Sequence, residues 1–208
     1  MSSSVLVVCS SNTCRSPLAL AALDRALTRH GFRAQVTLRS RGEDAEPGFP
    51  ACEQAMRTAS RHGLSTWLLE QHRSAPLDPR ELAMTDLILT ADRTVRASVV
   101  RLDPRVAGRT FTVREATLLA RRLPVGAQRP RDLAGFAAAL NDNRGLTELP
   151  TVERPWVLPW PRLQVHAHDV PDCHIDPRAS HRVVYRTLVP AIDELVDHLT
   201  TYIAVRQV

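Results

Sequence analysis

The sequence predicts an α/β fold of the doubly wound class, in which helices cover both faces of a central parallel sheet. Two observations are the apolar run at 5–8 and the strand-like segment at 86–91 with its apolar centre, both typical of strands buried on both faces. A third is that each run is followed by a segment in which apolar residues recur at helical spacing. Buried strands that alternate with amphipathic helices indicate the doubly wound arrangement.

The first half of the chain predicts two strands and two helices. A strand at 5–8 ends at Cys9, and after the polar loop at 10–15 a helix is predicted over 17–30. Pro17 suits the first turn of that helix because its missing N–H would have no partner there, and Gly31 is a stop signal. A second strand is predicted at 36–40 and a second helix at 51–62.

The second half continues the alternation. A strand is predicted at 86–91, a helix at 92–102, a short strand at 110–113 and a helix at 114–122. A further helix is predicted at 131–141 and a final one at 182–205. Pro190 lies inside the final pattern, so a kink or a break into two helices is expected there.

The domain organisation follows from length and composition. A chain of 208 residues with 44% hydrophobic and 24% charged residues suits a single globular domain. Six prolines interrupt the segment 121–167, which we interpret as a loop-rich insertion in a domain spanning 1–208. Trp156 and Trp160 lie in it, and they are expected to pin the loop to the body.

The charge pattern excludes several functions. All 27 basic residues are arginine, so Schiff-base lysine chemistry and the lysine-containing nucleotide loop are excluded. The block 101–162 holds 11 arginines against 6 acidic residues, and this excess suggests a surface for a partner or substrate. Aromatic residues make up only 4%, which argues against a nucleic-acid stacking surface.

Location and cofactors follow from what the sequence lacks. No apolar stretch is long enough to span a bilayer and 1–4 carries no basic signal region, so the sequence predicts a cytoplasmic protein with no membrane partner. The four cysteines resemble neither a disulfide framework nor a zinc-finger pattern, so we predict no metal and no cofactor.

The segment from Cys9 to Ser16 carries the chemistry. It lies between a buried strand and a helix N-terminus, where open α/β sheets bind ligands and unpaired N–H groups attract anions. Cys9 beside an arginine favours the thiolate, and the planar fork of Arg15 can hold two oxygens of a tetrahedral oxyanion. Ser16 can donate its hydroxyl to the sulfur.

This segment, Val-Leu-Val-Val-Cys-Ser-Ser-Asn-Thr-Cys-Arg-Ser-Pro, resembles the phosphate-binding loop of the low-molecular-weight protein tyrosine phosphatases. Further similar segments are Ser40-Arg41-Gly42, His72-Arg73-Ser74, Asp86-Leu87-Ile88-Leu89-Thr90 and, as in actinobacterial-type members, Arg109 to Glu115. The resemblance covers 4–120 and about 169–205, and it implies the three-layer α/β/α fold of that family.

The resemblance also implies roles for individual residues. Cys9 would attack phosphorus, Arg15 would bind the phosphoryl group and Ser16 would stabilise the thiolate. Asn12, Ser40 and His72 match positions that hold the loop in shape. The implied phosphate-binding residues are Ser10, Ser11, Asn12, Thr13, Cys14, Arg15 and Ser16.

A general acid is expected on a loop before the last helix, where the family has Asp-Pro. Asp172 and Asp176 are the candidates, and we favour Asp176 because Pro177 follows it and it precedes Tyr185 by the family's nine-residue spacing. The aromatic residue that the family carries after Asp-Pro is replaced by Arg178, which could favour an acidic or multiply phosphorylated substrate.

Two further positions in the loop, Ser11 and Cys14, bear on its conformation and on its redox chemistry. Ser11 stands where the family has glycine, which would matter if the backbone needed a positive φ there. Cys14 is either a small space-filling residue or a reversible disulfide partner that shields Cys9 from oxidation.

The predicted function is a phosphomonoesterase that hydrolyses phosphotyrosine-type substrates through a phosphocysteine intermediate. The expected partners are a phosphorylated protein or small aryl phosphate, and inorganic phosphate or another oxyanion in the loop. Two alternatives stay open: an arsenate reductase on the same scaffold, and a weakly catalytic module that binds phosphorylated partners. The oligomeric state is not predicted.

Overall fold

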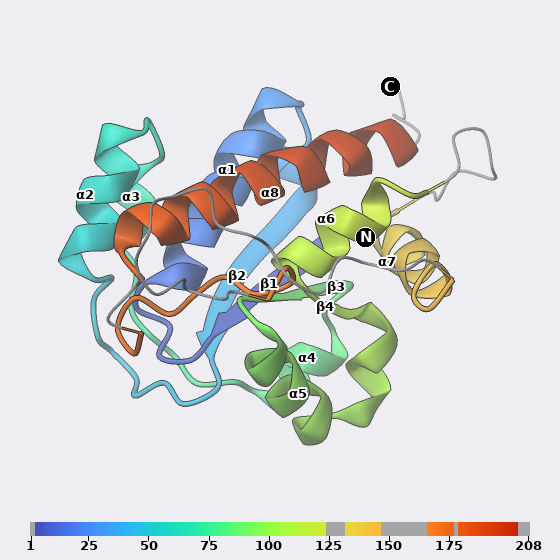
Figure 1. The fold of residues 1–208 in the computed structure, drawn as a ribbon, viewed down its shortest axis with the longest axis horizontal. Coiled ribbons are helices and arrows are strands. Elements are labelled where there is room, and N and C mark those ends of the chain that lie inside the picture. Colours follow the sequence, from blue (N-terminus) through green and yellow to red (C-terminus); the bar gives the residue numbers. More distant parts are fainter. Residues whose placement is uncertain (1–2, 124–131, 147–165, 177–178, 204–208) are drawn as a thin grey trace, which may run out of the picture.

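A four-stranded parallel sheet forms the centre of the computed structural model, which describes residues 3–123, 132–146, 166–176 and 179–203 (Figure 1). The strand order is β2-β1-β3-β4, so β1 lies between β2 and β3. This arrangement confirms the predicted fold class and the positions of the predicted strands. The strands are β1 (Ser3–Cys9), β2 (Val36–Gly42), β3 (Leu87–Thr90) and β4 (Thr110–Thr112).

Helices cover both faces of the sheet, as the apolar runs predict. Because side chains alternate along a strand, Val5 and Val7 of β1 join a large core cluster while Leu6 and Val8 join a smaller one on the opposite face. In Figure 1 the larger cluster is covered by α1, α6, α7 and α8, and the smaller one by α4 and α5. These helices are α1 (Arg15–Arg29), α4 (Pro79–Ala83), α5 (Arg93–Leu102), α6 (Val113–Ala120), α7 (Leu133–Asp142) and α8 (His181–Tyr202).

The final helix α8 runs without interruption past Pro190, so the expected break into two helices is wrong. Pro190 removes the hydrogen bond to the Arg186 carbonyl, but this proline is exposed and water can satisfy that oxygen. On the opposite side of the helix, Leu188 and Ile192 are buried on either side of the proline. Their packing against the core keeps the residues on both sides of the proline helical.

Several shorter elements complete the fold. Helix α2 was expected from the sequence and spans Glu53–Arg61, whereas α3 (Thr66–Glu70) and α4 were not expected. The 3-10 helices Arg33–Gln35 and Pro104–Arg109 were also not predicted. The signal for α4 is Asp78 followed by Pro79, since the Asp78 carboxylate accepts the N–H of Arg80 and caps the first turn.

The proposed insertion at 121–167 is described in part. Its helix α7 was predicted, and Leu133, Phe136 and Leu140 are buried in the larger core cluster. Trp156 and Trp160, which were expected to pin the loop, lie outside the described residues. The single-domain organisation with an insertion therefore stays a prediction, but α7 itself is part of the core.

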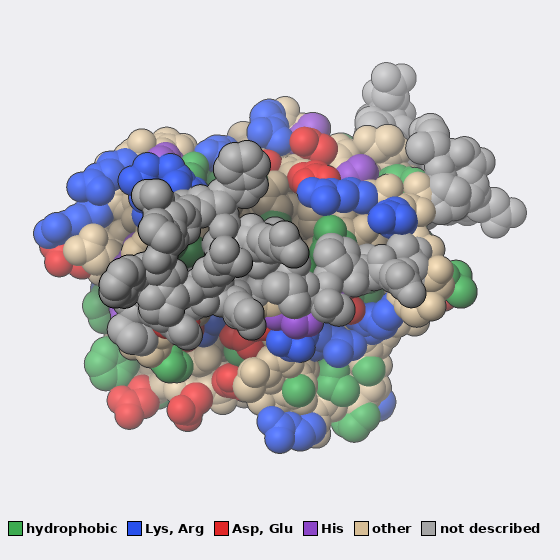
Figure 2. Space-filling model, viewed as in Figure 1, with side chains coloured by type: hydrophobic (Ala, Val, Ile, Leu, Met, Phe, Trp, Pro, Cys, Tyr) green, Lys and Arg blue, Asp and Glu red, His purple; other side chains and the backbone are tan. Residues whose placement is uncertain are grey.

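The arginines of the block 101–162 do not gather in one patch where the structure describes them. Arg105 pairs with Asp103, Arg121 with Glu194 and Arg144 with Glu115. Figure 2 shows basic side chains at several separate places on this face, with acidic ones among them. The excess charge in this part of the block is thus partly neutralised by internal ion pairs. Among the described helices, none is both long and apolar enough to cross a membrane.

Candidate active site

The loop after β1 lies at the carboxyl edge of the sheet, between the ends of β2 and β3. Cys9 is the last residue of β1, and Arg15 is the first residue of α1, so the loop ends directly at a helix N-terminus. Neighbouring segments hold the loop's carbonyl oxygens: Glu43 N–H donates to Cys9 at 3.0 Å and Cys52 N–H donates to Thr13 at 2.7 Å. The loop is therefore a preformed, concave arrangement at the place where doubly wound proteins bind ligands.

A chain of hydrogen bonds ends at the Cys9 sulfur. The Asn12 amide donates to the Ser16 hydroxyl at 2.8 Å, and the Ser16 oxygen lies 3.1 Å from the buried Cys9 Sγ. Because the Ser16 oxygen already accepts from Asn12, its own hydrogen is available to donate to the sulfur. The Ser16 hydroxyl and the N-terminus of α1 therefore both direct hydrogen-bond donors or partial positive charge toward the position of the Cys9 sulfur.

Asn12 is held in a left-handed conformation, with φ of 56°. Its amide also donates to Ser40 Oγ at 3.0 Å, and its side-chain oxygen accepts the N–H of Ala75 at 3.0 Å. His72 Nε2 lies 2.6 Å from the Asn12 carbonyl oxygen, so this nitrogen carries the hydrogen and donates it. The structure thus brings Asn12, Ser40 and His72 together around the loop.

The remaining loop side chains face one another or the arginine. Ser11 Oγ and Thr13 Oγ1 lie 2.9 Å apart, and Ser10 Oγ accepts from Arg15 at 3.1 Å. Among the described non-glycine residues, Asn12 is the one with a positive φ, so Ser11 needs no left-handed conformation. The loop accommodates serine at this position without backbone strain.

Gly42, at the end of β2, packs directly against the loop. A Cβ at this position would overlap the Ser10 carbonyl oxygen and would lie 2.9 Å from the Asn12 nitrogen. Both contacts are with backbone atoms, which cannot move aside as a flexible side chain can. Only glycine lets β2 approach the loop this closely.

The Arg15 guanidinium is buried beneath the loop, with 4% of its surface exposed, and it contacts two carboxylates. Nη1 donates to Asp92 at 2.7 Å and to the Val170 carbonyl at 3.2 Å, while Nη2 contacts Asp172. Burial alone would lower the pKa of Arg15, but the charges of Cys9, Asp172 and Asp92 outweigh it and raise the pKa above its usual value.

The two candidate acids occupy different positions. The Asp172 carboxylate contacts Arg15 and also accepts the backbone N–H of His174 at 2.9 Å. Asp176 lies one turn further along, where its N–H donates to the Asp172 carbonyl at 2.8 Å. Tyr185, whose spacing favoured Asp176, stacks on His62 with ring centroids 3.8 Å apart. Pro177 and Arg178 lie outside the described residues.

Asp92 is a functional candidate that sequence reasoning missed. It follows β3 directly, and its other carboxylate oxygen caps α5 by accepting the Val95 N–H at 2.9 Å. The Asp92 carboxylate therefore both caps the N-terminus of α5 and holds the Arg15 guanidinium in position. The available signal was its place immediately after a buried strand, at the same edge of the sheet as the loop.

Thiols and imidazoles gather beside the loop, although the sequence predicts no metal site. Cys14, Cys52, His174 and His181 each offer a ligand atom within 4.8 Å of the others. Cys14 Sγ also lies 3.7 Å from Cys173 Sγ. Hydrogen bonding from Cys173 and Cys52, together with burial, raises the pKa of Cys14. Hydrogen bonding from Cys14 lowers the pKa of Cys52 to about 4, against the opposing effect of burial.

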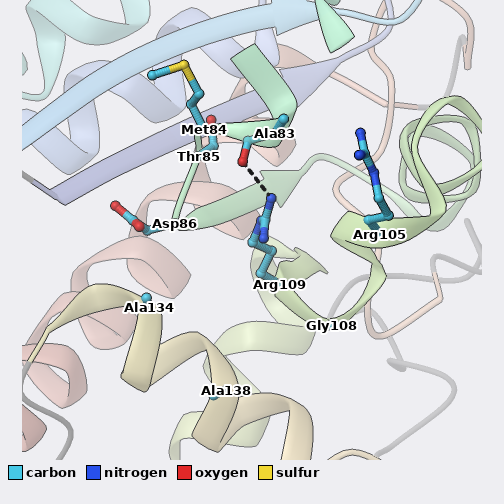
Figure 3. A pocket seen from close by; sticks show the side chains of 9 residues that line it. All are labelled: Ala83, Met84, Thr85, Asp86, Arg105, Gly108, Arg109, Ala134 and Ala138. Atoms are coloured by element: carbon cyan, nitrogen blue, oxygen red, sulfur yellow. Dashed lines mark hydrogen bonds between the residues drawn. The ribbon is translucent and has the colours of Figure 1, made fainter. Parts of the chain in front are cut away.

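A separate cavity of about 280 Å³ lies at the opposite, amino-terminal edge of the sheet (Figure 3). Arg109 points into it and donates to the Ala83 carbonyl at 2.9 Å, and Ala134 and Ala138 of α7 form its floor. The residues with nucleophilic and oxyanion-binding chemistry are at the carboxyl edge instead. We therefore assign the candidate active site to the loop and not to this cavity.

Comparisons with known proteins agree with this geometry. A family model described as low molecular weight phosphotyrosine protein phosphatase matches residues 4–129. The low molecular weight protein-tyrosine-phosphatase Wzb of Salmonella typhimurium is 36% identical over 111 residues, which span 53% of this chain and 68% of the relative.

Solved structures extend the similarity to the C-terminal part. The tyrosine phosphatase AmsI of Erwinia amylovora superposes with a TM-score of 0.61 at 23% identity and covers 95% of this chain and 93% of its own, which is a likeness of fold. The low molecular weight protein tyrosine phosphatase of T. tengcongensis gives a TM-score of 0.52 at 27% identity, over 68% of this chain and 97% of its own.

Proposed function

The chain belongs to the low molecular weight phosphotyrosine protein phosphatase family, and we propose that it hydrolyses phosphotyrosine-type monoesters with Cys9 as nucleophile, Arg15 as phosphate-binding residue and Asp172 as general acid. The observation that carries the assignment of the acid is the contact between the Asp172 carboxylate and Arg15. A group at that position lies where the phosphoryl oxygens and the leaving group would meet.

In the first step the Cys9 sulfur attacks phosphorus. The S–P bond forms while the P–O bond to the leaving group breaks, and the product is a phosphocysteine. The Ser16 hydroxyl supports the attacking thiolate from 3.1 Å. The backbone N–H groups of the loop and the N-terminus of α1 stabilise the negative charge on the phosphoryl oxygens.

Arg15 binds the phosphoryl group through its planar pair of N–H donors. One donor faces Asp92 and the other faces Asp172. We infer that the substrate dianion takes the place of Asp172 on Arg15, while Asp92 stays and fixes the plane of the guanidinium. An arginine held in this way can hold two oxygens and follow them into the trigonal bipyramidal transition state.

Asp172 then transfers protons. Its carboxylic acid gives a proton to the departing phenolate oxygen, which leaves as a phenol. In the second step the carboxylate takes a proton from water as the water oxygen attacks phosphorus, and the S–P bond breaks. Inorganic phosphate leaves, and Cys9 returns to the thiolate.

Asp172 is preferred to Asp176 on geometry. The carboxylate of Asp172 reaches the arginine and also accepts the backbone N–H of His174, which fixes its position beside the loop. The Asp-Pro pair that favoured Asp176 also has a structural explanation, since proline fixes a turn. Asp176 remains the alternative acid, and the experiment below separates the two.

An aromatic side chain supports an aryl phosphate as substrate. Phe49 lies in the segment 43–52, which is hydrogen-bonded to the loop at both ends, and 51% of its surface is exposed. An exposed phenyl ring beside an oxyanion loop is suited to pack against the ring of a phenolic ester. Phosphorylated proteins and small aryl phosphates are therefore the proposed substrates, and inorganic phosphate is the proposed product ligand.

The test is hydrolysis of two aryl phosphates by the wild type and by Cys9→Ser, Asp172→Asn and Asp176→Asn. We expect Cys9→Ser to abolish turnover and Asp172→Asn to lower kcat by roughly 10²- to 10⁴-fold, the usual scale for a general acid. The loss should be larger for phenyl phosphate than for p-nitrophenyl phosphate, because nitrophenolate leaves without protonation. Asp176→Asn is the matched control and should keep most of the activity.

Other outcomes would redirect the assignment. A larger loss in Asp176→Asn than in Asp172→Asn would make Asp176 the acid. Wild-type turnover no better than that of Cys9→Ser would favour the phosphate-binding module. Thiol-dependent formation of arsenite from arsenate, lost in Cys9→Ser and accompanied by poor ester hydrolysis, would favour the reductase.

We also propose a cytoplasmic location. All four cysteines are free thiols in the structure, and a cysteine nucleophile works only while it stays reduced. The cytoplasm keeps thiols in that state.

A further inference from the structure

Four segments that lie far apart in the sequence bring their thiols and imidazoles to one point beside the phosphate loop. Cys14 ends the loop, Cys52 precedes α2, His174 follows Asp172 and His181 begins α8. Their ligand atoms all lie within 4.8 Å of one another. Cys14 is buried, Cys52 and His181 are half-buried, and His174 is exposed, so the cluster extends from the core to the surface.

The spacing of the cluster is close to that of a tetrahedral metal site. Zinc bonds of about 2.3 Å to sulfur and about 2.0–2.1 Å to nitrogen place neighbouring ligand atoms roughly 3.3–3.8 Å apart. Cys52 Sγ and His181 Nε2 lie 3.3 Å apart. The rings of His174 and His181 are nearly perpendicular, with an interplanar angle of 86° and centroids 5.1 Å apart. The two imidazoles thus approach the point from different directions.

The donor types select the metal. Two cysteine sulfurs and two imidazole nitrogens are the ligand set of structural zinc sites, whereas calcium and magnesium require oxygen ligands. Two thiolates would balance the charge of a divalent ion. Binding would release a proton from each thiol, and the imidazoles would bind as neutral rings.

We propose that Cys14, Cys52, His174 and His181 bind a zinc ion, which joins the phosphate loop, the start of α2, the acid-bearing segment and the start of α8. Each ligand comes from a different segment, so the ion would add four metal bonds to the weak thiol and imidazole hydrogen bonds that these side chains make. Cys173 lies next to Cys14, with 3.7 Å between their sulfurs, and is not one of the four assigned ligands.

The position of Asp172 links this site to catalysis. The backbone N–H of His174 donates to the Asp172 carboxylate at 2.9 Å, and Cys14 directly precedes Arg15. Zinc bound to both side chains would therefore hold the acid at a fixed distance from the phosphate-binding arginine. This consequence rests on the proposed function, whereas the metal site itself rests only on the ligand cluster.

The experiment titrates the reduced full-length protein with Zn²⁺ and, separately, with Co²⁺ as a spectroscopic probe. A Cys9→Ser background removes the nucleophile as a competing ligand. We expect one ion per chain, a thiolate-to-cobalt charge-transfer band and the intense visible bands of tetrahedral cobalt. Zinc should also raise the melting temperature.

Ligand variants locate the site. Cys52→Ser keeps a side chain able to cap α2, and His174→Ala changes an exposed side chain, so both variants should fold. Each should weaken zinc binding by about a hundredfold or more, since even second-shell losses cost 10- to 100-fold. Cys173→Ser is the matched control and should bind zinc as tightly as the parent protein.

Three results would overturn the proposal. The first is that Cys52→Ser and His174→Ala bind zinc as tightly as the parent protein. The second is a cobalt complex without a thiolate band. The third is that Cys173→Ser alone loses zinc binding. Phosphatase activity is measured on matched proteins that keep Cys9 and carry the same ligand substitutions. Zinc binding without ester hydrolysis would overturn only the proposed function, and hydrolysis without site-specific zinc binding would overturn only the metal site.

Discussion

Ser16 links the helix N-terminus to Cys9, the nucleophile that we propose, through a single hydroxyl. It accepts from Asn12 and lies 3.1 Å from the Cys9 sulfur, so its role depends on one hydrogen. Replacing it leaves Cys9, Arg15 and the loop backbone in place. The residue is therefore a sharp test of how much the hydrogen bond to sulfur contributes.

We predict that Ser16→Ala lowers kcat by about ten- to a hundredfold, because a hydrogen bond to a charged group is worth about 1.5–3 kcal/mol. Steady-state hydrolysis of an aryl phosphate measures this, and the rate of thiol alkylation at pH 7 should fall with it. Ser11→Ala is the control, since its hydroxyl contacts Thr13 and not the sulfur. Equal effects of the two substitutions would contradict the assigned role of Ser16.

His72, which is hydrogen-bonded to the loop, makes the free energy of unfolding depend on pH. Burial lowers the pKa of His72 from its ordinary value of 6.5, the hydrogen bond to the Asn12 carbonyl offsets part of this, and the charges of Arg73 and Arg41 lower it further. Between the lowered folded value and 6.5, the unfolded chain binds a proton that the folded chain does not. Stability contributed by neutral His72 is thus present above pH 6.5 and is lost as pH falls through the folded pKa.

We predict that the free energy of unfolding falls more steeply from pH 7 to pH 5 in the wild type than in His72→Gln. Glutamine keeps an N–H donor for the Asn12 carbonyl but does not titrate. Urea denaturation at several pH values measures the two slopes. His168, whose pKa burial also lowers, is unchanged in both proteins and cancels in the comparison. Parallel slopes would rule out His72 as the source.

At the scale of single elements, α8 shows where sequence reasoning needs tertiary context. Pro190 predicts an interruption because it removes one hydrogen bond and crowds the preceding turn. The helix nevertheless spans His181–Tyr202, since buried residues on both sides of the proline anchor it to the core. Local preference is a weak guide when an amphipathic face has a large core to pack on.

We predict that Pro190→Ala stabilises the protein, by up to about 3 kcal/mol, because alanine restores the hydrogen bond to the Arg186 carbonyl and has the highest helix propensity. The side chain at 190 is exposed, so no core contact is lost. Urea or thermal denaturation measures the change. Arg182→Ala, an exposed substitution in the same helix, should have little effect, and a destabilised Pro190→Ala would show that the proline fits the native backbone.

The strands and longer helices could be predicted from the sequence because their signals are local. The apolar runs fixed β1 and β3, and stop signals such as Gly31 marked helix ends within a few residues. Helices of a single turn, such as α3 and α4, escaped because too few residues repeat to give a periodicity. The one local signal was Asp78 before Pro79 at the start of α4, and these two residues alone do not distinguish a helix start from a turn.

For the whole molecule, α8 joins the active site to the larger core. It begins next to the acid-bearing segment and then packs along α1 and α6 (Figure 1). Ile192, in its middle, is fully buried. The position of Asp172, the acid that we propose, therefore depends on the same core that stabilises the fold.

We predict that Ile192→Ala lowers the free energy of unfolding by about 2–5 kcal/mol, the usual cost of truncating a buried aliphatic side chain. Met84→Ala, where 82% of the side chain surface is exposed, should change it by less than about 0.5 kcal/mol. Chemical denaturation measures both. Similar values for the two variants would show that α8 is not an integral part of the cooperative core.

For the candidate active site, too, residues close together in the sequence could be predicted, whereas contacts between distant segments could not. The sequence placed Cys9, Ser16 and Arg15 on one loop because they are neighbours in the chain, and the strand before them located that loop in the sheet. It did not reveal Asp92, which follows the neighbouring strand β3 and reaches Arg15 at the same edge of the sheet, nor the contact of Cys52 with His181. Such contacts depend on how helices pack, which no single spacing encodes.

The contact of Arg15 with Asp172 also sets an order of events in biosynthesis. The two residues are separated by 157 positions. At a translation rate of about 5–20 residues per second, the arginine leaves the ribosome on the order of ten seconds before its carboxylate partner. During that interval the nascent chain carries Cys9 and Arg15 but lacks Asp172, the acid that we propose. With Asp172 as the proposed acid, full activity is expected only after the sheet and the segment beyond it have been synthesised.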